Sequence, residues 1–133
     1  MKSTTRPTPA IPLEVIDECA VLRPAGYLNA RLGGEIERLC SEAIDSGVRY
    51  FIIDFADVST INTIGLSLLM GAIERVHERE GLVYFTALGA TDRQVFEALN
   101  LSCIAPQFAE VAQAREHIER DRAVAKRTGE RHS

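Results

Sequence analysis

Three short patterns contain residue types that could do chemistry, and each lacks a part that the chemistry requires. Gly65-Leu66-Ser67 has the start of a nucleophile elbow, in which a sharp turn exposes a catalytic serine, but Leu69 occupies the position of the closing glycine. Gly33-Gly34 is not followed by the Gly-Lys-Ser/Thr of a phosphate-binding loop. Glu74 and His77 have the spacing of a metal-ligand pair, but such sites need further pairs from other helices. The sequence therefore predicts a protein that is not an enzyme and that holds no metal or cofactor.

The stretch from residue 50 to residue 66 carries the most information about function. Its first part, 50–55, is a nearly unbroken apolar run, typical of a strand buried on both faces of an α/β sheet. The strand ends near Asp54, in the region where α/β proteins usually place their sites. After a loop, Asn62 is a predicted helix N-cap, and Thr63 begins the helix at the positive end of its dipole. We expect Gly65 to let this helix pack closely on the sheet.

The helix expected over residues 63–79 has two different faces when projected at 100° per residue. The face predicted to meet the core carries Gly65, Leu68, Leu69, Ala72 and Val76. The opposite face is a stripe of small and polar residues with an apolar residue at each border: Thr63, Ser67, Gly71, Glu74 and Glu78, bordered by Ile64 and Met70. Such a stripe suits the docking of another protein, although small residues that simply face solvent would give the same pattern.

Charge and composition limit the classes of partner. The chain has 133 residues and a net charge of −4, and its hydrophobic content of 46% is that of an ordinary globular domain. The acidic body argues against nucleic-acid binding, which needs clustered Lys and Arg. Three widely spaced cysteines form no disulfide framework or metal motif, and no apolar run is long enough to cross a membrane. We expect a cytoplasmic protein that does not insert into membranes.

Proline and charge distribution predict the limits of one domain. Residues 1–12 contain three prolines and are predicted to be a flexible arm. The domain itself is expected to occupy residues 13–121. Residues 122–133 carry four basic residues against one acidic residue and are predicted to be a disordered basic tail.

The hydrophobic periodicity predicts an α/β fold, with a mixed, mostly parallel sheet of four to five strands packed with about four helices. Two short strands at 13–16 and 20–23 are expected to be joined by a tight turn and followed by a loop at 26–30. The remaining predictions are a helix from 32 to 44, a strand at 82–88, a helix opened by a capping box of Thr91 and Gln94, a short strand near 102–104, and a last helix from about 111.

The stretch 53–66, Ile-Asp-Phe-Ala-Asp-Val-Ser-Thr-Ile-Asn-Thr-Ile-Gly-Leu, resembles the signature of the STAS domain family of anti-sigma-factor antagonists. That signature reads roughly Leu-Asp-Leu-Ser-x-Val-x-x-hydrophobic-Asp-Ser-Ser-Gly-Leu. Residues 26–30 resemble the family's turn before the first helix, and residues 95–101 resemble its leucine pair before the last strand. The resemblance extends over roughly residues 13–121 and implies the STAS fold.

The resemblance also implies a function. Members of this family bind a serine-kinase anti-sigma factor or a related switch protein, which phosphorylates the first serine of Asp-Ser-Ser-Gly and so releases the antagonist. By position the phosphoacceptor is Thr63. The implied partner-binding residues are Asn29, Asn62, Thr63, Ile64, Ser67, Met70, Gly71 and Glu74. The chain departs from the family pattern at Asn29, Asn62 and Ile64, where the family has aspartate, aspartate and serine. Phosphorylation of Thr63 and a role for Thr63 in capping alone are both open at this point.

Two other functions remain open from the sequence. STAS modules also act as accessory subunits of membrane transporter ATPase complexes, some of them with threonine at the switch position. A nucleotide could bind the loop before residue 63, although no lysine or arginine lies near Thr63 in sequence. Whether the chain forms a homodimer is also left open.

Overall fold

The computed structural model describes residues 11–101 and 104–128, with side chains placed through Val124. Its strands are β1 (Leu13–Ile16), β2 (Cys19–Leu22), β3 (Ala25–Leu28), β4 (Tyr50–Asp54), β5 (Asp57–Ile61), β6 (Leu82–Thr86) and β7 (Gln107–Phe108). Its helices are α1 (Ala30–Asp45), α2 (Thr63–Glu78), α3 (Ala90–Ala98) and α4 (Val111–Thr128).

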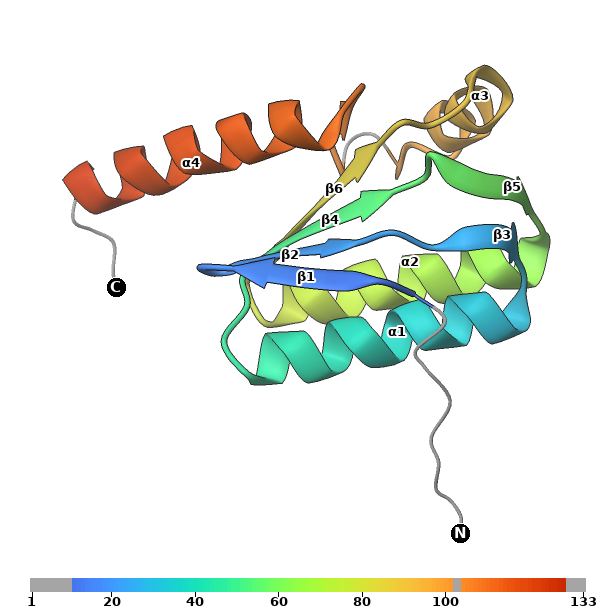
Figure 1. Ribbon diagram of the computed structural model, residues 1–133, viewed down its shortest axis with the longest axis horizontal. Helices are drawn as coiled ribbons and strands as arrows, with labels where there is room; N and C mark the ends of the chain where they lie inside the picture. The colour runs from blue at the N-terminus through green and yellow to red at the C-terminus, as the bar shows by residue number, and fades with distance from the viewer. Residues whose placement is uncertain (1–10, 102–103, 129–133) are drawn as a thin grey trace, which may run out of the picture.

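The main sheet has five strands in the order β1-β2-β4-β6-β7. The β1–β2 pair is antiparallel and the other pairs are parallel. Helices α1 and α2 lie side by side on one face of this sheet, and α4 lies on the other face (Figure 1). The mixed, mostly parallel sheet and the helices that the sequence predicts are therefore confirmed.

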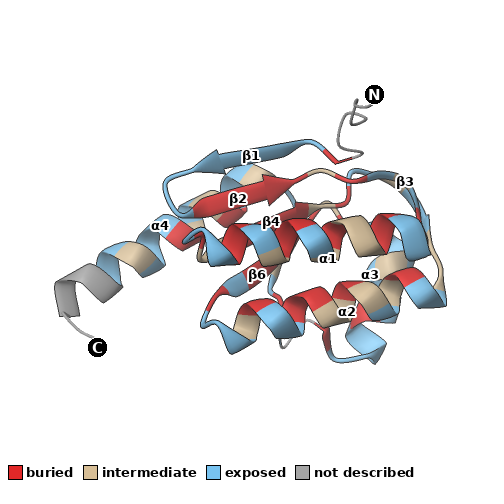
Figure 2. Ribbon diagram, turned by 90° about the horizontal axis from the view of Figure 1, so that it is seen from below, coloured by how far each residue is buried: buried red, intermediate tan, exposed pale blue. Residues whose placement is uncertain are grey.

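The apolar run of β4 is explained by helices on both faces of the sheet. Phe51 and Ile53 belong to the larger core, which packs against α1 and α2. Ile52 belongs to a smaller core in which Ala114 and Ile118 of α4 pack on the opposite face. Because successive side chains of a strand point to opposite faces, a strand covered on both sides has no exposed polar position. Figure 2 shows β2 buried along its length and the buried stripes that α1 and α2 turn toward the sheet.

Two predicted loops are in fact strands. Residues 25–28 and 57–61 pair with each other in parallel and form a separate two-stranded sheet, β3–β5. The register shifts between Gly26 and Tyr27, where Gly26 has a φ of 90°. Neither strand is buried along one whole face, so neither has the alternation by which strands are recognised in a sequence. This small sheet leads directly into α1 on one side and α2 on the other.

Three other predictions about the chain need correction. Ile11 is buried in the larger core, so the domain includes the end of the predicted arm; residues 1–10 lie outside the described residues. Residues 122–128 are predicted to be disordered, but they are helical, because α4 continues to Thr128. The strand predicted near 102–104 falls mostly on residues outside the description, and the edge strand next to β6 is Gln107–Phe108.

The start of α3 also differs from prediction. The helix begins at Ala90 with Gly89 as its N-cap, and no side chain makes a capping hydrogen bond there. Thr91 and Gln94 therefore lie within the first turns and do not form the predicted capping box. The Thr-x-x-Gln pattern placed the cap two residues too late, because residues just inside a helix start can have the same spacing.

Candidate functional site

Two helix N-termini lie side by side where the small sheet ends. Asn29 is the N-cap of α1, and its Oδ1 accepts a hydrogen bond from the backbone N–H of Leu32 at 3.1 Å. Asn62 is the N-cap of α2, and its Oδ1 accepts from the N–H of Gly65 at 2.7 Å. The N–H of Asn62 also donates to the carbonyl of Leu28 at 3.0 Å. The predicted capping role of Asn62 is confirmed, and Asn29 has the same role.

Gly65 is required by the close approach of these two helix starts. A Cβ atom at Gly65 would lie 2.2 Å from the carbonyl oxygen of Leu28 and 3.1 Å from the Cα of Asn29. The predicted close packing of Gly65 is present, but its neighbour is the junction between β3 and α1 and not the main sheet. A second close contact between α1 and α2 lies nearer their C-terminal ends, where a Cβ at Gly33 would be 2.9 Å from the Cβ of Leu68. Small residues thus allow α1 and α2 to pack closely together (Figure 2).

Asp54 fixes the start of the connection that leads to this site. Its Oδ1 accepts hydrogen bonds from the backbone N–H of Ala56 at 3.2 Å and from the hydroxyl of Thr86 at 3.1 Å. Its Oδ2 lies 3.6 Å from the Nε of Arg23. Thr86 is completely buried, so its hydroxyl needs a protein acceptor. Asp54 therefore orients the turn from β4 into β5 and does not itself face the candidate surface.

The solvent-exposed part of the site is small and largely uncharged. Thr63 and Ser67 are exposed on successive turns of α2. Ile64 is 57% exposed and Tyr27 of β3 is 50% exposed, both high values for large hydrophobic side chains. We call Tyr27, Asn62, Thr63, Ile64 and Ser67 the Thr63 surface. Tyr27 is absent from the predicted site residues because the sequence predicts a loop over residues 26–30, and Ala25-Gly-Tyr-Leu28 has no alternation of apolar and polar residues to indicate a strand.

The remaining predicted residues on α2 lie farther along the helix, and they differ in their exposure to solvent. Glu74 is exposed, but Met70 is half-buried and packs against the larger core. Gly71 is also half-buried. The side chain of Glu37 on α1 lies over it, since a Cβ at Gly71 would be 3.3 Å from a carboxylate oxygen of Glu37. The predicted outward stripe is therefore open at its N-terminal end and partly covered by α1 at Gly71.

A hollow of about 590 Å³ lies beside the Thr63 surface, between β5 and the start of α3. Val58, Ser59, Thr60 and Ile61 form one wall, and residues 89–92 with Val95 form most of the other. Asp92 is the charged residue among those that line it. The hollow extends the accessible surface from the end of β5 toward α3.

The described residues contain no cluster of three or more His, Cys, Asp or Glu side chains that could hold a metal ion. In the same part of the chain, no helix has the length and hydropathy needed to cross a membrane.

The chain belongs to the STAS domain family, whose sequence pattern it matches over residues 10–114. The arrangement of a short parallel ribbon leading into two adjacent helix starts lies within that match. The predicted family membership is confirmed.

Solved structures of anti-sigma factor antagonists have the same fold. A Thermotoga maritima protein assigned to this class has a TM-score of 0.74 at 16% identity, over 82% of this chain and 94% of its own. The Bacillus cell fate determinant SpoIIAA in its phosphorylated form has a TM-score of 0.68 at 23% identity, over 82% and 99%. The antagonist from Mycobacterium paratuberculosis has a TM-score of 0.70 at 17% identity, over 82% and 92%. At these identities the likeness establishes the fold.

Proposed function

We propose that this protein is a non-catalytic regulatory module that binds a serine-kinase anti-sigma factor or a related switch protein through the Thr63 surface. The observation that supports this most is the exposure of Thr63 and Ile64 at the start of a helix whose position is fixed by Gly65 and Asn62. A rigid, mostly uncharged surface with exposed apolar side chains is what a protein partner can bury at low cost in desolvation and side-chain entropy. The fold shared with anti-sigma factor antagonists is consistent with this class of partner.

We propose further that phosphorylation of Thr63 controls this binding. A phosphate would add about −1.5 to −2 charges to the surface. The amides at the start of α2 can accommodate that charge in the free protein, and the first turn of α2 contains no acidic residue to repel it. A partner packed on Thr63 would have to bury the charge, which is costly unless the charge is paired. SpoIIAA, which shares the fold, has been solved in both phosphorylated and unphosphorylated forms.

The amide side chains of the two N-cap residues are compatible with phosphorylation of Thr63. Asn29 and Asn62 make the capping hydrogen bonds through their Oδ1 atoms, which a carboxylate would also provide. Replacing aspartate by asparagine thus preserves the helix starts and removes negative charge beside Thr63. We infer that this makes the surface a better acceptor of the phosphate, because fewer neighbouring charges repel it.

The experiment is a pull-down from the native cells with the wild-type chain and three variants, followed by mass spectrometry. We expect the wild type and Thr63→Ser to recover a kinase of the ATPase type, and Thr63→Glu to lose it. Gln113→Glu is the matched charge control. It adds the same charge on α4, on the opposite face of the sheet (Figure 1), and the new carboxylate can still accept the hydrogen bond from the N–H of Ala109.

Intact mass measurement of the protein from the same cells tests the modification directly. A phosphate mass shift that maps to Thr63 supports the switch. Recovery of a membrane transporter ATPase subunit in place of a kinase would favour the accessory-subunit function. If Thr63→Glu and wild type recover the same proteins, the Thr63 surface is not the binding site.

A further inference from the structure

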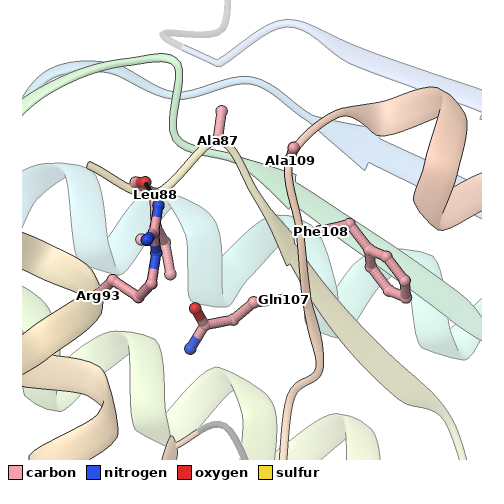
Figure 3. Close-up of a pocket in the computed structure, with 6 residues that line it drawn as sticks. All are labelled: Ala87, Leu88, Arg93, Gln107, Phe108 and Ala109. Atoms are coloured by element: carbon pink, nitrogen blue, oxygen red, sulfur yellow. Dashed lines mark hydrogen bonds between the residues drawn. The ribbon is translucent and has the colours of Figure 1, made fainter. Parts of the chain in front are cut away.

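A cavity of about 510 Å³ lies at the C-terminal ends of β6 and β7, next to α3. It is lined by Ala87, Leu88, Arg93, Gln107, Phe108 and Ala109 (Figure 3). None of these residues belongs to the Thr63 surface. Ligands of α/β proteins commonly bind beyond the carboxyl ends of parallel strands, and the volume falls within the range of about 300–1,000 Å³ typical of small-molecule sites.

Arg93 brings an unpaired positive charge to this cavity. Its Nη2 donates a hydrogen bond to the carbonyl of Leu88 at 3.3 Å. No carboxylate of the described residues forms an ion pair with it, whereas Arg38, Arg79 and Arg122 each have at least one. A guanidinium has five N–H donors in a planar fork that fits carboxylate and phosphate oxygens. Most of the donors of Arg93 thus remain available to a ligand.

Gln107 supplies a second donor that lacks a partner. Its Nε2 atom is buried and makes no hydrogen bond with the described residues. Figure 3 shows the carboxamide of Gln107 pointing to the side on which Arg93 lies, whereas the ring of Phe108 points to the opposite side of the strand. That ring packs near Tyr84 and His117 in the smaller core. A buried N–H₂ without an acceptor is unfavourable. Because Nε2 is covered in this structure, the carboxamide of Gln107 has to turn toward the cavity before a ligand oxygen there can accept its hydrogen bond.

The lining of the cavity carries no acidic side chain, although the first turn of α3 follows directly after Leu88. The acidic residue of this first turn, Asp92, lines the hollow next to β5 and is not among the residues that line this cavity. No carboxylate of the described residues therefore lines the cavity to repel an anion.

We propose that this cavity binds a small organic anion, with its carboxylate or phosphate group held by Arg93 and Gln107. The oxygens of the anion accept hydrogen bonds from the guanidinium of Arg93 and from Nε2 of Gln107. The carbon body of the ligand contacts Leu88 and the alanine side chains. This site is separate from the Thr63 surface and does not depend on the function proposed for it.

The test is an NMR titration of the full-length ¹⁵N-labelled protein with sodium phosphate and with sodium succinate, each at ionic strength matched with sodium chloride. We expect saturable shifts of the Arg93 Nε–H signal, the Gln107 side-chain amide and the backbone amides around Leu88, with at least one of the two anions. Arg93→Gln is expected to weaken binding about tenfold or more, since it removes a charged hydrogen-bond donor. Arg120→Gln, at an exposed position of α4, is expected to bind like the wild type.

A second variant separates loss of anion binding from loss of folding. Gln107→Glu preserves the size of the side chain and places a carboxylate in the cavity, so we expect it to abolish binding of both anions while the rest of the spectrum stays unchanged. Thr63→Glu should leave the titration unaltered. The proposal is overturned if neither anion gives saturable shifts at Arg93 and Gln107, or if Arg93→Gln and Arg120→Gln bind equally well.

Discussion

The backbone of Gly65 packs directly against the carbonyl oxygen of Leu28, which lies only 2.2 Å from the position that a Cβ of residue 65 would occupy. This contact places the first turn of α2 beside the first turn of α1 and so determines how Thr63 and Ile64 are presented. The neighbouring hydrogen bond from the N–H of Asn62 to the same carbonyl holds the junction from the other side. The geometry of the candidate surface therefore rests on backbone contacts between two segments far apart in the sequence.

Replacing Gly65 by alanine should destabilise the protein. The new methyl group would overlap a backbone atom that cannot move without shifting β3 or α1, and overpacking of this kind typically costs about 1–3 kcal/mol. Gly34→Ala is the matched control, because a Cβ at that helical position meets nothing within 4 Å. That variant should be more stable by about 0.5–1 kcal/mol. Urea denaturation followed by circular dichroism measures the free energy of unfolding of both variants. Equal effects of the two substitutions would show that Gly65 does not pack closely against Leu28.

Loss of the N-cap at Asn62 should cost about 1 kcal/mol in the free energy of unfolding, as is usual when alanine replaces asparagine at this position. Asn62→Asp should retain the stability of the wild type, because a carboxylate oxygen can accept the same hydrogen bond from Gly65. The control is Ser67→Ala, an exposed position in the same helix, for which a change within about 0.5 kcal/mol is expected. Thermal and urea unfolding of the three variants tests the prediction, which is wrong if Asn62→Ala is as stable as Ser67→Ala.

The hydrogen bond between Thr86 and Asp54 should be visible in a double-mutant cycle. Thr86→Val keeps the shape of the buried side chain and removes its donor to Asp54, at a predicted cost of about 1–2 kcal/mol. In an Asp54→Ala background the same substitution should cost less, because the acceptor is gone. A coupling energy of about 1 kcal/mol is expected for residues in direct contact. Strict additivity of the two substitutions would show that the bond contributes nothing.

Cys40 should react with alkylating reagents only when the protein unfolds. Its side chain is 1% exposed in the larger core, and burial raises the pKa of its thiol to about 12. At pH 8 the fraction of reactive thiolate is then on the order of 1 in 10,000, against about 1 in 10 for a thiol with a pKa near 9. Peptide mapping after treatment with iodoacetamide, in buffer and in concentrated urea, provides the comparison. Rapid native labelling of Cys40 would contradict its burial.

Glu14 should make stability depend on pH in the acid range. The hydrogen bond from Arg23, and after it the guanidinium of Arg115 that lies 3.1 Å from the same carboxylate oxygen, lower the pKa of this carboxyl group below its ordinary value of 4.5. A carboxylate whose pKa is lower in the folded state stabilises the protein above the unfolded pKa and loses this contribution as the pH falls through the folded pKa. The wild type should therefore exceed Glu14→Gln in stability at pH 7, and the difference should vanish in strong acid.

The control for this comparison is Glu97→Gln, at an exposed carboxylate of α3 that has no ion pair among the described residues. Its difference from the wild type should stay small at every pH. Urea midpoints measured between pH 7 and pH 3 give both curves. A Glu14→Gln curve parallel to the wild type throughout this range would exclude the predicted linkage.

The sequence by itself determined the elements whose signal is local. The apolar run of β4, the amphipathic repeat of α1 and the cap at Asn62 follow from residues within one or two turns of each other, so their hydrophobic period and hydrogen-bonding groups predict them directly. The signature at 53–66 likewise identifies the family without coordinates. Thr63 could be placed at the start of a helix for the same reason.

Only the tertiary structure decided the features that depend on contacts between distant segments. The strands β3 and β5 are stable because they pair with each other, and neither carries an alternating pattern of its own. The contact of Gly65 with Leu28, the partial covering of Gly71 by α1, and the convergence of Arg93 and Gln107 on one cavity all join residues from different elements. No local pattern contains such information, because the free energy that fixes these positions comes from packing the elements together.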